Sequence, residues 1–385
     1  MKPKHTFIVL FSTYFLILSS CINSDKINLE IDSSAPFKYE IKVNNILDSV
    51  NFNSIVKEYD FIPLETNEKC RINDIEDIRV TKNRILVISN GVYGFDSHGK
   101  FKYAINKRGK SSGAFVKLND VSVNNDVFYI YDNTNYRLSK YNVEDGHFIR
   151  AITLPYSVRQ VQVINDTLFM NKAKINNGFL EGNQNIMIST FADLTNVKGM
   201  VKEQSYDYLV DNQLWAANGQ IFWRNVLNNA VYKINSHSIE NYISFSFGEL
   251  SFSQKEIEKT SLNKLALNHN KIFNLSKVQE SKQHILGQAM IGGLPIWVIY
   301  NKASNEFIAY KNVNSSLLQF TPTSQAVEND KFYRVLSTIE VNFMRGMISR
   351  NPIAKTPNDP EFHIFNSIKN SKNGDNPVII SFKLK

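Results

Sequence analysis

The chain has 385 residues, of which 43% are hydrophobic, 21% charged and 12% aromatic, and its formal net charge at pH 7 is +8. These values exclude a disordered, collagen-like or disulfide-stapled protein and leave enough apolar material for one large core or two ordinary ones. The basic balance could suit acidic partners, but no run of Lys and Arg is dense enough to indicate a nucleic-acid-binding tail. Composition therefore predicts a globular protein that binds no nucleic acid, and it names no ligand.

The first residues predict export and a lipid anchor. Lys2 and Lys4 form a basic start, and residues 7–18 form an apolar run that is too short to cross a membrane comfortably. The run ends in Leu18-Ser19-Ser20-Cys21, which resembles the bacterial lipobox, where the cysteine is lipidated and the signal is cut just before it. The alternative is an ordinary secretory signal with an incidental cysteine.

The lipobox reading divides the chain into three parts. Residues 1–20 are a lipoprotein signal peptide, residues 21–36 a polar lipidated tether that begins with Cys21, and residues 37–385 the folded domain. We expect a protein anchored by lipid to the bacterial cell envelope, at the outer membrane, with the periplasmic or surface side left open. Cys70 then has no partner for an intramolecular disulfide, and we expect a loop or half-buried thiol rather than a nucleophile.

The folded part is predicted to be all-β. Short alternating segments are separated by Asn, Asp, Gly and Ser, and residues 75–105 and 118–152 each contain three strand-like runs, a polar turn with Gly, and a Phe-led fourth strand. An aromatic or apolar residue marks the third strand of each unit, at Phe95, Tyr141, Phe191, Ile234, Tyr300 and Phe382. Units of roughly 40–50 residues are typical of a β-propeller, and six markers predict six blades.

Two longer intervals and the chain ends complete this prediction. Residues 251–273 and 339–352 have helical character and are expected to be short helical insertions. The last unit stops at its third strand, so its fourth should come from the N-terminal part of the domain, for which residues 56–65 are the natural candidate. Residues 38–43 are a possible additional edge of that blade. Such a closure would remove an open sheet edge.

These features together are similar to a known family. The lipobox, YDFIPLET (59–66), INDIEDIRV (72–80), the FDSHGKF turn (95–101) and NPVIISFKLK (376–385) resemble the six-bladed β-propeller lipoproteins of Bacteroidetes, a group similar to NHL and TolB-type propellers. The resemblance implies a fold and an envelope location. It implies no established reaction, and the loop at 107–115 is more basic and has fewer glycines than expected for the family.

A search for catalytic and metal-binding patterns gives negative expectations. His98, His147 and His237 recur once per unit, but they lie at the turns between third and fourth strands, where ligands from different blades diverge. The sequence has no HExxH, no phosphate-binding GxxxxGK[ST] and no GxSxG. We therefore predict no metal, no cofactor and no catalytic residue.

The remaining candidates lie at equivalent positions of several blades, where the blades should converge on the propeller axis. Arg suits carboxylate or sulfate groups, and Trp suits sugar rings or peptide side chains. Each also has a purely structural explanation, because Arg137 could stabilise a turn through Asp132 and the tryptophans could be core residues. The predicted ligand-binding candidates are Arg108, Lys110, Asp132, Arg137, Arg159, Trp215, Trp223 and Arg224.

Two functions remain open at this stage. The favoured one is a non-catalytic binding or scaffold propeller that recognises a protein, a peptide or an acidic glycan, with loops 107–113, 155–160 and 215–225 forming a basic rim. The alternative is a propeller hydrolase or lyase that acts on an acidic polysaccharide. Two carboxylates with an Arg in one pocket would favour the enzyme, and an axis filled by apolar side chains would exclude it.

Overall fold

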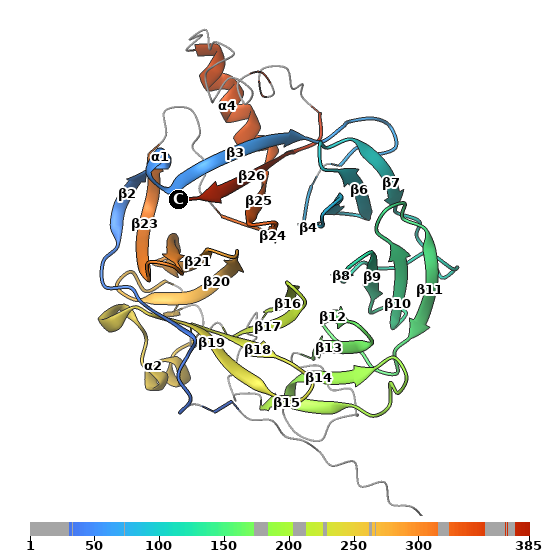
Figure 1. Cartoon of the computed structure of the whole chain (residues 1–385), viewed down its shortest axis with the longest axis horizontal. Coiled ribbons are helices and arrows are strands. Elements are labelled where there is room, and N and C mark those ends of the chain that lie inside the picture. The colour runs from blue at the N-terminus through green and yellow to red at the C-terminus, as the bar shows by residue number, and fades with distance from the viewer. Residues whose placement is uncertain are drawn as a thin grey trace, which may run out of the picture.

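A computed structural model of the chain shows six mainly antiparallel sheets arranged around a central axis (Figure 1). It describes residues 31–385 except 33, 73, 173–183, 203–212, 226–228, 262–263, 266, 315–322, 351–365, 367 and 369–373. The predicted all-β, six-bladed propeller is thereby confirmed. The predicted signal peptide and Cys21 lie outside the described residues.

Each of the first five blades contains a meander of four antiparallel strands that runs outward from the axis in chain order (Figure 1). The strands of the first three blades are β4 (Asp77–Val80), β5 (Arg84–Ile88), β6 (Val92–Asp96) and β7 (Phe101–Ile105); β8 (Asp120–Asn124), β9 (Val127–Asp132), β10 (Arg137–Asn142) and β11 (Phe148–Thr153); and β12 (Gln160–Ile164), β13 (Thr167–Asn171), β14 (Gln184–Thr190) and β15 (Lys198–Lys202). Those of blades four and five are β16 (Gln213–Ala217), β17 (Gln220–Asn225), β18 (Ala230–Ile234) and β19 (Ile239–Ser246), followed by β20 (Ile272–Glu280), β21 (His284–Ile291), β22 (Leu294–Asn301) and β23 (Glu306–Asn314).

The sixth blade joins the two ends of the domain. Its first three strands are β24 (Ala326–Glu328), β25 (Lys331–Leu336) and β26 (Val378–Leu384), and its fourth is β3 (Val56–Pro63) from the N-terminal part. β3 pairs antiparallel with β26, with Tyr59 opposite Phe382 and Pro63 opposite Val378. The predicted closure is confirmed, and it pairs β26 on both sides, so that β26 is not left as an open edge.

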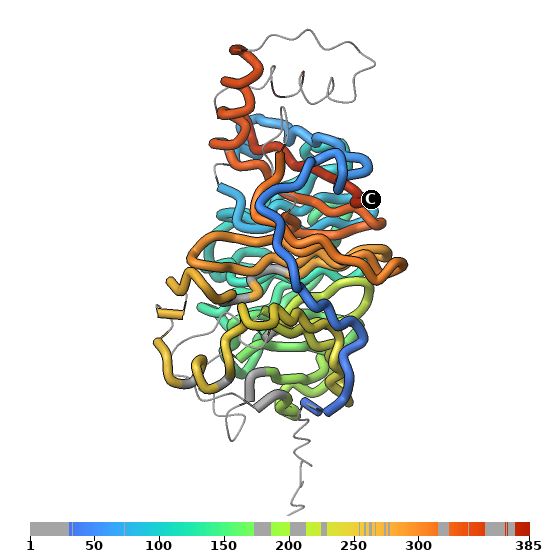
Figure 2. Tube along the Cα trace, turned by 90° about the vertical axis from the view of Figure 1, so that its left-hand side faces the viewer, coloured from blue at the N-terminus to red at the C-terminus, as the bar shows by residue number. Residues whose placement is uncertain are grey.

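The chain before β3 forms a belt around the outside of three blades, seen as the blue tube in Figure 2. β1 (Tyr39–Lys42) pairs in parallel with β19 of blade four, and β2 (Leu47–Asn51) pairs in parallel with β23 of blade five. The short helix α1 (Phe52–Ile55) then leads into β3. The prediction that residues 38–43 edge the last blade is therefore wrong, because these residues cover the outer edge of blade four instead.

Glycine recurs in the turn between the third and fourth strands because this turn packs closely against the preceding blade. Gly99 has φ +82°, and a Cβ at this position would lie 2.2 Å from the backbone oxygen of Pro63 in blade six. Gly146, in the matching turn of blade two, has φ +72° and would meet the ring of Tyr103 in blade one at 2.4 Å. Glycine thus allows each of these turns to pack closely against the preceding blade.

Helices occur between strands, as predicted for both inserts. The first insert contains α2 (Gln254–Lys259), whose start is fixed by a capping box of Ser253 and Glu256, and the short helix η1 (Gly248–Leu250) lies just before this insert. The second contains α4 (Thr338–Arg350), which stands out from the ring (Figures 1 and 2) and packs Val341, Met344 and Ile348 on the core of the last blade. Within the described residues, none of the helices has the length and apolarity needed to cross a membrane.

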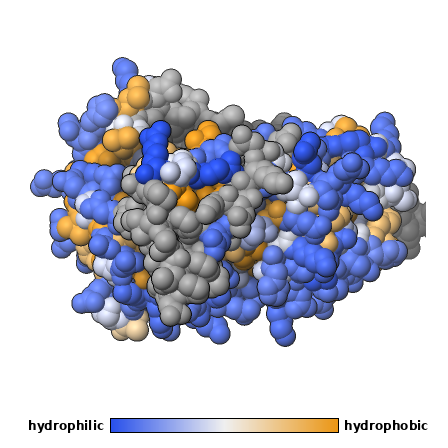
Figure 3. All heavy atoms as spheres, turned by 90° about the horizontal axis from the view of Figure 1, so that it is seen from above, coloured by the Kyte–Doolittle hydropathy of each residue, from blue (hydrophilic) through white to orange (hydrophobic). Residues whose placement is uncertain are grey.

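Alternation within the first strand of each blade divides side chains between core and axis. Ile78, Val121 and Val161 are buried between blades, and their neighbours on either side project toward the axis because side chains alternate along a strand. The outer rim seen in Figure 3 carries mainly hydrophilic residues with apolar ones scattered among them. The side chains of the first strands that face the axis are therefore candidates for a functional site.

Candidate functional site

The axis of the propeller is an open channel. A cavity of about 1570 Å³ is lined by the first strands of blades one to four and six, by Gln279 of β20, and by adjoining turns. Its volume exceeds the range of about 300–1,000 Å³ usual for small-ligand pockets. Apolar side chains do not fill the axis, so the condition that would exclude an enzyme is not met.

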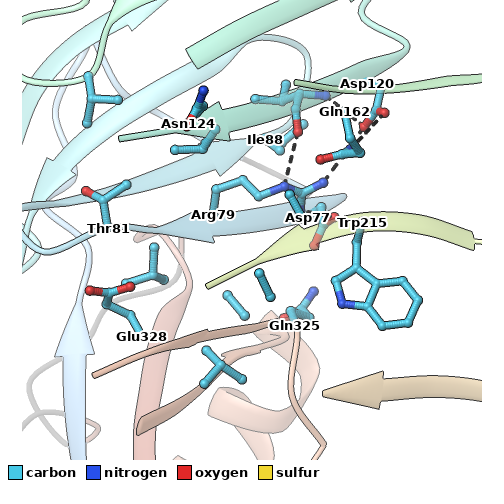
Figure 4. Close-up of a pocket in the computed structure, with 18 of the residues that line it drawn as sticks. Asp77, Arg79, Thr81, Ile88, Asp120, Asn124, Gln162, Trp215, Gln325 and Glu328 are labelled. Atoms are coloured by element: carbon cyan, nitrogen blue, oxygen red, sulfur yellow. Dashed lines mark hydrogen bonds and ion pairs between the residues drawn. The ribbon is translucent and has the colours of Figure 1, made fainter. Parts of the chain in front are cut away.

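The two ends of the channel differ in how the chain reaches them. The end at which the chain enters each first strand, for example through residues 106–119 and 154–159, is here called the connection end. The end formed by turns between first and second strands, such as 81–83, 125–126 and 218–219, is called the turn end. Figure 4 shows Asp77, Asp120 and Gln162 toward the connection end, with Thr81, Asn124 and Glu328 toward the turn end.

Arg79 of β4 lies between two carboxylates of this channel. Its guanidinium forms an ion pair with Asp77 and lies 3.8 Å from Asp120 of the next blade, and its Nε donates to the backbone oxygen of Val121 over 3.1 Å (Figure 4). Burial disfavours charge on Arg79, but the two carboxylates outweigh this effect and raise the pKa of the guanidinium. Arg79 thus links the first strands of blades one and two.

Asp120 continues this linkage to blade three. Its two carboxylate oxygens accept from the backbone N–H groups of Val121 and Val161 at 2.9 Å each, and from the amide of Gln162 at 3.3 Å. Burial raises the pKa of Asp120, and the guanidinium of Arg79 and the N–H of Val161 oppose that shift. Its oxygens are occupied by donors of the protein itself.

Further side chains join the first strands of blades two, three and four. The hydroxyl of Ser122 accepts from the backbone N–H of Val163 at 2.9 Å, and the side-chain oxygen of Gln160 accepts from Leu214 at 3.2 Å. Other carboxamides near the connection end also have partners within the protein, namely Asn119, Gln213 and Gln325. Polar side chains here substitute for the backbone pairing that first strands of different blades lack.

The carboxylates of Asp77 and Asp120 with Arg79 are the combination that would favour a glycosidase. Their hydrogen bonds argue for a structural role, because a general acid must hold a transferable proton and a nucleophile needs an unoccupied oxygen. Asp77 accepts from the N–H of Ile78 and is ion-paired to Arg79, and both oxygens of Asp120 are bonded. The cluster builds the channel wall rather than a reaction centre.

The charge of the lining differs from the basic rim predicted from the sequence. Acidic residues outnumber basic ones six to three among the described residues that line the channel. The acidic residues are Glu76, Asp77, Asp120, Asp126, Glu144 and Glu328, and the basic ones are Arg79, Lys82 and Arg159. Although Glu144 is paired with Arg84 outside the lining, the channel keeps an acidic surplus, and a polyanion would find no excess of positive charge there.

Two of the eight predicted binding residues reach the channel. Arg159, at the start of blade three, and Trp215, in the middle of β16, both belong to its lining. Trp215 is half-buried and stacks on Phe222 with ring centroids 5.6 Å apart. They are the two predicted candidates that the structure places in the lining of the channel.

Arg108 is committed to its own loop. Its guanidinium donates to the backbone oxygens of Val116 and Asn90 and lies over the ring of Phe115, 4.6 Å from the centroid. It is solvent-exposed but lies outside the channel lining. Arg108 therefore stabilises the connection between blades one and two.

Asp132 and Arg137 organise the same connection. Arg137 donates to the backbone oxygens of Lys110, at 2.9 Å, and of Ala114, and Asp132 accepts from the N–H of Val116 at 2.7 Å. Lys110 itself is exposed and contributes its carbonyl to this contact. Arg137 thus stabilises this connection through carbonyls of the loop, and the described contacts include none between its side chain and Asp132, through which the sequence suggested that it could act.

Trp223 and Arg224 are buried, and the grouping of residues 215–225 as one rim loop is wrong. Trp223 is 1% exposed and packs against Tyr232, and Arg224 is 3% exposed and donates to Gln213. The segment is a hairpin of β16 and β17 whose turn at 218–219 lies at the turn end, whereas loops 107–113 and 155–160 lie at the connection end. The three segments therefore do not share one rim.

The structure also places residues at the axis that were not among the candidates. Arg79, Ser122, Gln162 and Gln325 line or border the channel together with Asp77 and Asp120. A signal for them exists in the sequence, since β4, β8 and β12 begin with Asp-Ile-Arg, Asp-Val-Ser and Gln-Val-Gln. A polar-apolar-polar triplet at the start of a blade marks the residues that face the axis.

The three histidines lie at the predicted turns, whereas Cys70 is more deeply buried than predicted. His98, His147 and His237 are exposed at turns between third and fourth strands. No group of three His, Cys, Asp or Glu residues is placed to hold a metal among the residues that the structure describes. Cys70 is fully buried, and its thiol contacts the backbone oxygen of Glu65 at 3.1 Å.

Solved structures with a similar fold include a protein of Bacteroides. The chain is similar to a Bacteroides fragilis NCTC 9343 protein described as exported (BF0058), with a TM-score of 0.71 and 19% sequence identity over 90% of this chain and 99% of that one. The extracellular domain of a one-component system (BT4673) from B. thetaiotaomicron matches 66% of this chain and 29% of that chain, with a TM-score of 0.34 and 11% identity. At these identities the likeness concerns the fold alone.

Sequence comparison identifies the family. No curated protein matches the chain significantly. The model of the family described as a domain of unknown function, DUF4934, matches residues 38–383, which is nearly the whole folded part. The chain therefore belongs to the DUF4934 family.

Proposed function

We propose that this chain is a non-catalytic ligand-binding propeller of the bacterial cell envelope, anchored by a lipid on Cys21, and that its ligand occupies the central channel. The observation that carries this proposal is the open cavity of about 1570 Å³, lined by polar side chains from the first strands of several blades. Sites of this kind, concave and with convergent polar groups, are the usual place of ligand binding. The ligand is a protein segment, a peptide or a glycan.

The envelope location is supported by the first 21 residues, where a basic start, an apolar run and a lipobox-like ending occur together. A lipid with several acyl chains would hold the protein at a membrane permanently. We extend the resemblance to Bacteroidetes propeller lipoproteins and to NHL and TolB-type propellers on the same basis. The outer membrane is the proposed site of anchoring.

A hydrolase or lyase that acts on an acidic polysaccharide is the less favoured function. Two carboxylates and an Arg do lie together in the channel, but Asp120 is bonded through both oxygens and Asp77 is paired with Arg79. The acidic surplus of the lining would also repel an anionic polymer. Binding without catalysis agrees better with these contacts.

The proposal that the ligand binds in the channel can be tested by introducing larger side chains that block the channel. Ala217, the last residue of β16, lines the cavity near the turn end, so Ala217→Leu and Ala217→Trp introduce side chains of increasing size there. Ligands are first found by screening the purified full-length chain, in a detergent without a sugar headgroup, against glycan and peptide arrays. We expect graded loss of binding in the order wild type, Leu, Trp, with unchanged circular dichroism.

A ligand that binds both variants as well as the wild type would place the binding site elsewhere. The Leu variant keeps the test decisive if the Trp variant fails to fold, because it adds less volume. Melting temperatures of all three proteins separate closure of the channel from damage to the fold.

A further inference from the structure

Carboxamide side chains at the turn end of the channel lack the partners that those at the connection end have. Gln160, Gln162 and Gln325 each take part in hydrogen bonds between strands. At the turn end, five lining residues make no side-chain hydrogen bond within the described part of the chain: Asn83, Asn124, Asn125, Asn218 and Gln279. The channel therefore has one end built from satisfied groups and one end with polar groups available to a ligand.

The backbone geometry of turns explains why Asn occurs at only some of these five positions. Asn125 and Asn218 have φ values of +54° and +50°, a conformation in which Asn is favoured whatever its side chain contacts. Asn124 and Gln279 have no such backbone requirement, because they lie within β8 and β20 and line the cavity. Figure 4 shows Asn124 beside the channel, on the same side as Thr81 and Glu328.

The chemistry of this end suits hydroxyl groups. A carboxamide offers two donor hydrogens and an acceptor oxygen, and a hydroxyl both donates and accepts, so the two satisfy one another in either direction. The acidic surplus of the lining disfavours an anionic ligand. Trp215, deeper in the channel, adds an aromatic surface of the kind that packs against the apolar face of a sugar ring.

A peptide fits this end less well. Peptide and protein ligands are held mainly by apolar and aromatic anchors in desolvated pockets. Among the described residues, the exposed large hydrophobic side chains all lie elsewhere, in connections such as Val116 and Leu267, on outer strands such as Ile308, or on other elements outside the channel lining. The polar groups that this mouth presents are mainly amides and carboxylates, and the apolar residues of its lining, such as Val80 and Val123, are half-buried.

From these observations we infer that the channel binds a neutral oligosaccharide, which enters through the turn end and is hydrogen-bonded by Asn124 and Gln279. This inference rests on the proposed function, because it specifies the ligand class and the entry side of the same channel. It replaces the acidic glycan expected from the sequence with an uncharged one.

The test uses the full-length chain and an array that carries neutral oligosaccharides, uronic-acid and sulfated oligosaccharides, and peptides. The neutral oligosaccharide with the strongest signal is then titrated by calorimetry against three proteins. These are the wild type, the double variant Asn124→Ala/Gln279→Ala, and the matched control Asn106→Ala/Gln220→Ala. The control removes one Asn and one Gln that are exposed, lie outside the channel and have no side-chain hydrogen bond in the described residues.

We expect the double variant to weaken binding about tenfold or more, as loss of two hydrogen bonds should, and the control to bind like the wild type. Affinity should stay constant between about 50 mM and about 500 mM salt, because an uncharged ligand is not screened. Binding of only acidic oligosaccharides or peptides, abolished by Ala217→Trp, would overturn this inference and leave the proposed function intact. Failure of every neutral oligosaccharide to bind, or equal binding by double variant and control, would also overturn it.

Discussion

The side-chain amide of Asn376 donates to the backbone oxygen of Cys70 over 2.6 Å and thereby joins residues 306 positions apart in the chain. Its oxygen accepts from the N–H of Ile72 at 2.7 Å, and the amide also donates to the backbone oxygen of Glu65 at 2.7 Å. Asn376 is buried, just before β26. It secures the connection from blade six to blade one beside the strand pair that closes the ring.

This arrangement predicts that Asn376→Ala destabilises the protein by about 2–3 kcal/mol, because it leaves several buried backbone groups without a partner. Urea denaturation followed by tryptophan fluorescence measures the change. The exposed Asn106, changed to Ala, should leave the unfolding midpoint almost unaltered. Similar midpoints for the two variants would show that the closure does not depend on Asn376.

A second prediction concerns the contact between Gly99 and Pro63. Gly99→Ala should cost about 2–4 kcal/mol, because it combines a left-handed backbone conformation with a clash against the backbone of blade six. Gly293→Ala is the matched control, since Gly293 has φ +77° but nothing within 4 Å of the added Cβ. It should cost only about 1 kcal/mol. Equal losses in chemical denaturation would contradict the close packing of the turn.

The third prediction tests the ion pairs of Arg79. Arg79→Gln should destabilise the fold by about 3 kcal/mol, because Asp120 is left buried without its counter-charge. The double variant Arg79→Gln/Asp120→Asn should lose less stability than the two single variants together, because the ion pair between these residues can be lost only once. A double-mutant cycle in urea measures this coupling. Additive losses would show that the two residues do not interact.

A fourth prediction follows from the pKa of Glu256 in the first insert. The hydrogen bond from Lys271, together with those from Ser253, lowers the pKa of Glu256 from 4.5 to about 2. Because the folded pKa is the lower one, ionised Glu256 stabilises the protein above about pH 4.5, and this contribution is lost as the pH falls toward 2. Wild type and Glu256→Gln should therefore differ in stability at pH 6 and converge by about pH 2.

Thermal unfolding at a series of pH values measures that difference, and the subtraction removes the contribution of other titrating groups. Glu249→Gln, at an exposed acid of η1 with no hydrogen-bond partner among the described residues, serves as control. It should show no comparable pH-dependent gap. A gap for Glu256→Gln that persists at low pH would contradict the assigned ion pair.

The fifth prediction concerns the lipid. Cys21→Ala should abolish metabolic labelling by a fatty-acid analogue and release the protein from membranes, because we propose the thiol of Cys21 as the acceptor of the lipid. Fractionation of cells that express either protein measures the release, with Cys70→Ala as a control that keeps the lipid site. Membrane association that persists in the Cys21 variant would contradict lipidation at this residue.

The number of blades and the closure of the ring were accessible from the sequence because they depend on local patterns. Alternation with a period of two, turn residues, and the recurrence of Phe95, Tyr141 and Phe382 in third strands require only neighbouring residues to agree. The missing fourth strand of the last unit followed from counting. Its partner, residues 56–63, could be found because few other strand-like segments were unassigned.

The site and the path of the belt were decided by the tertiary structure. Nothing local distinguishes pairing of residues 39–42 with blade four from pairing with blade six, because an edge strand can extend any outer strand that presents free backbone groups. Likewise, Arg108 and Arg159 look alike as exposed loop residues, yet the fold turns the first onto Phe115 and leaves the second at the channel. Sequence patterning specifies which faces of a strand are buried, whereas the direction of a polar side chain depends on partners from other blades.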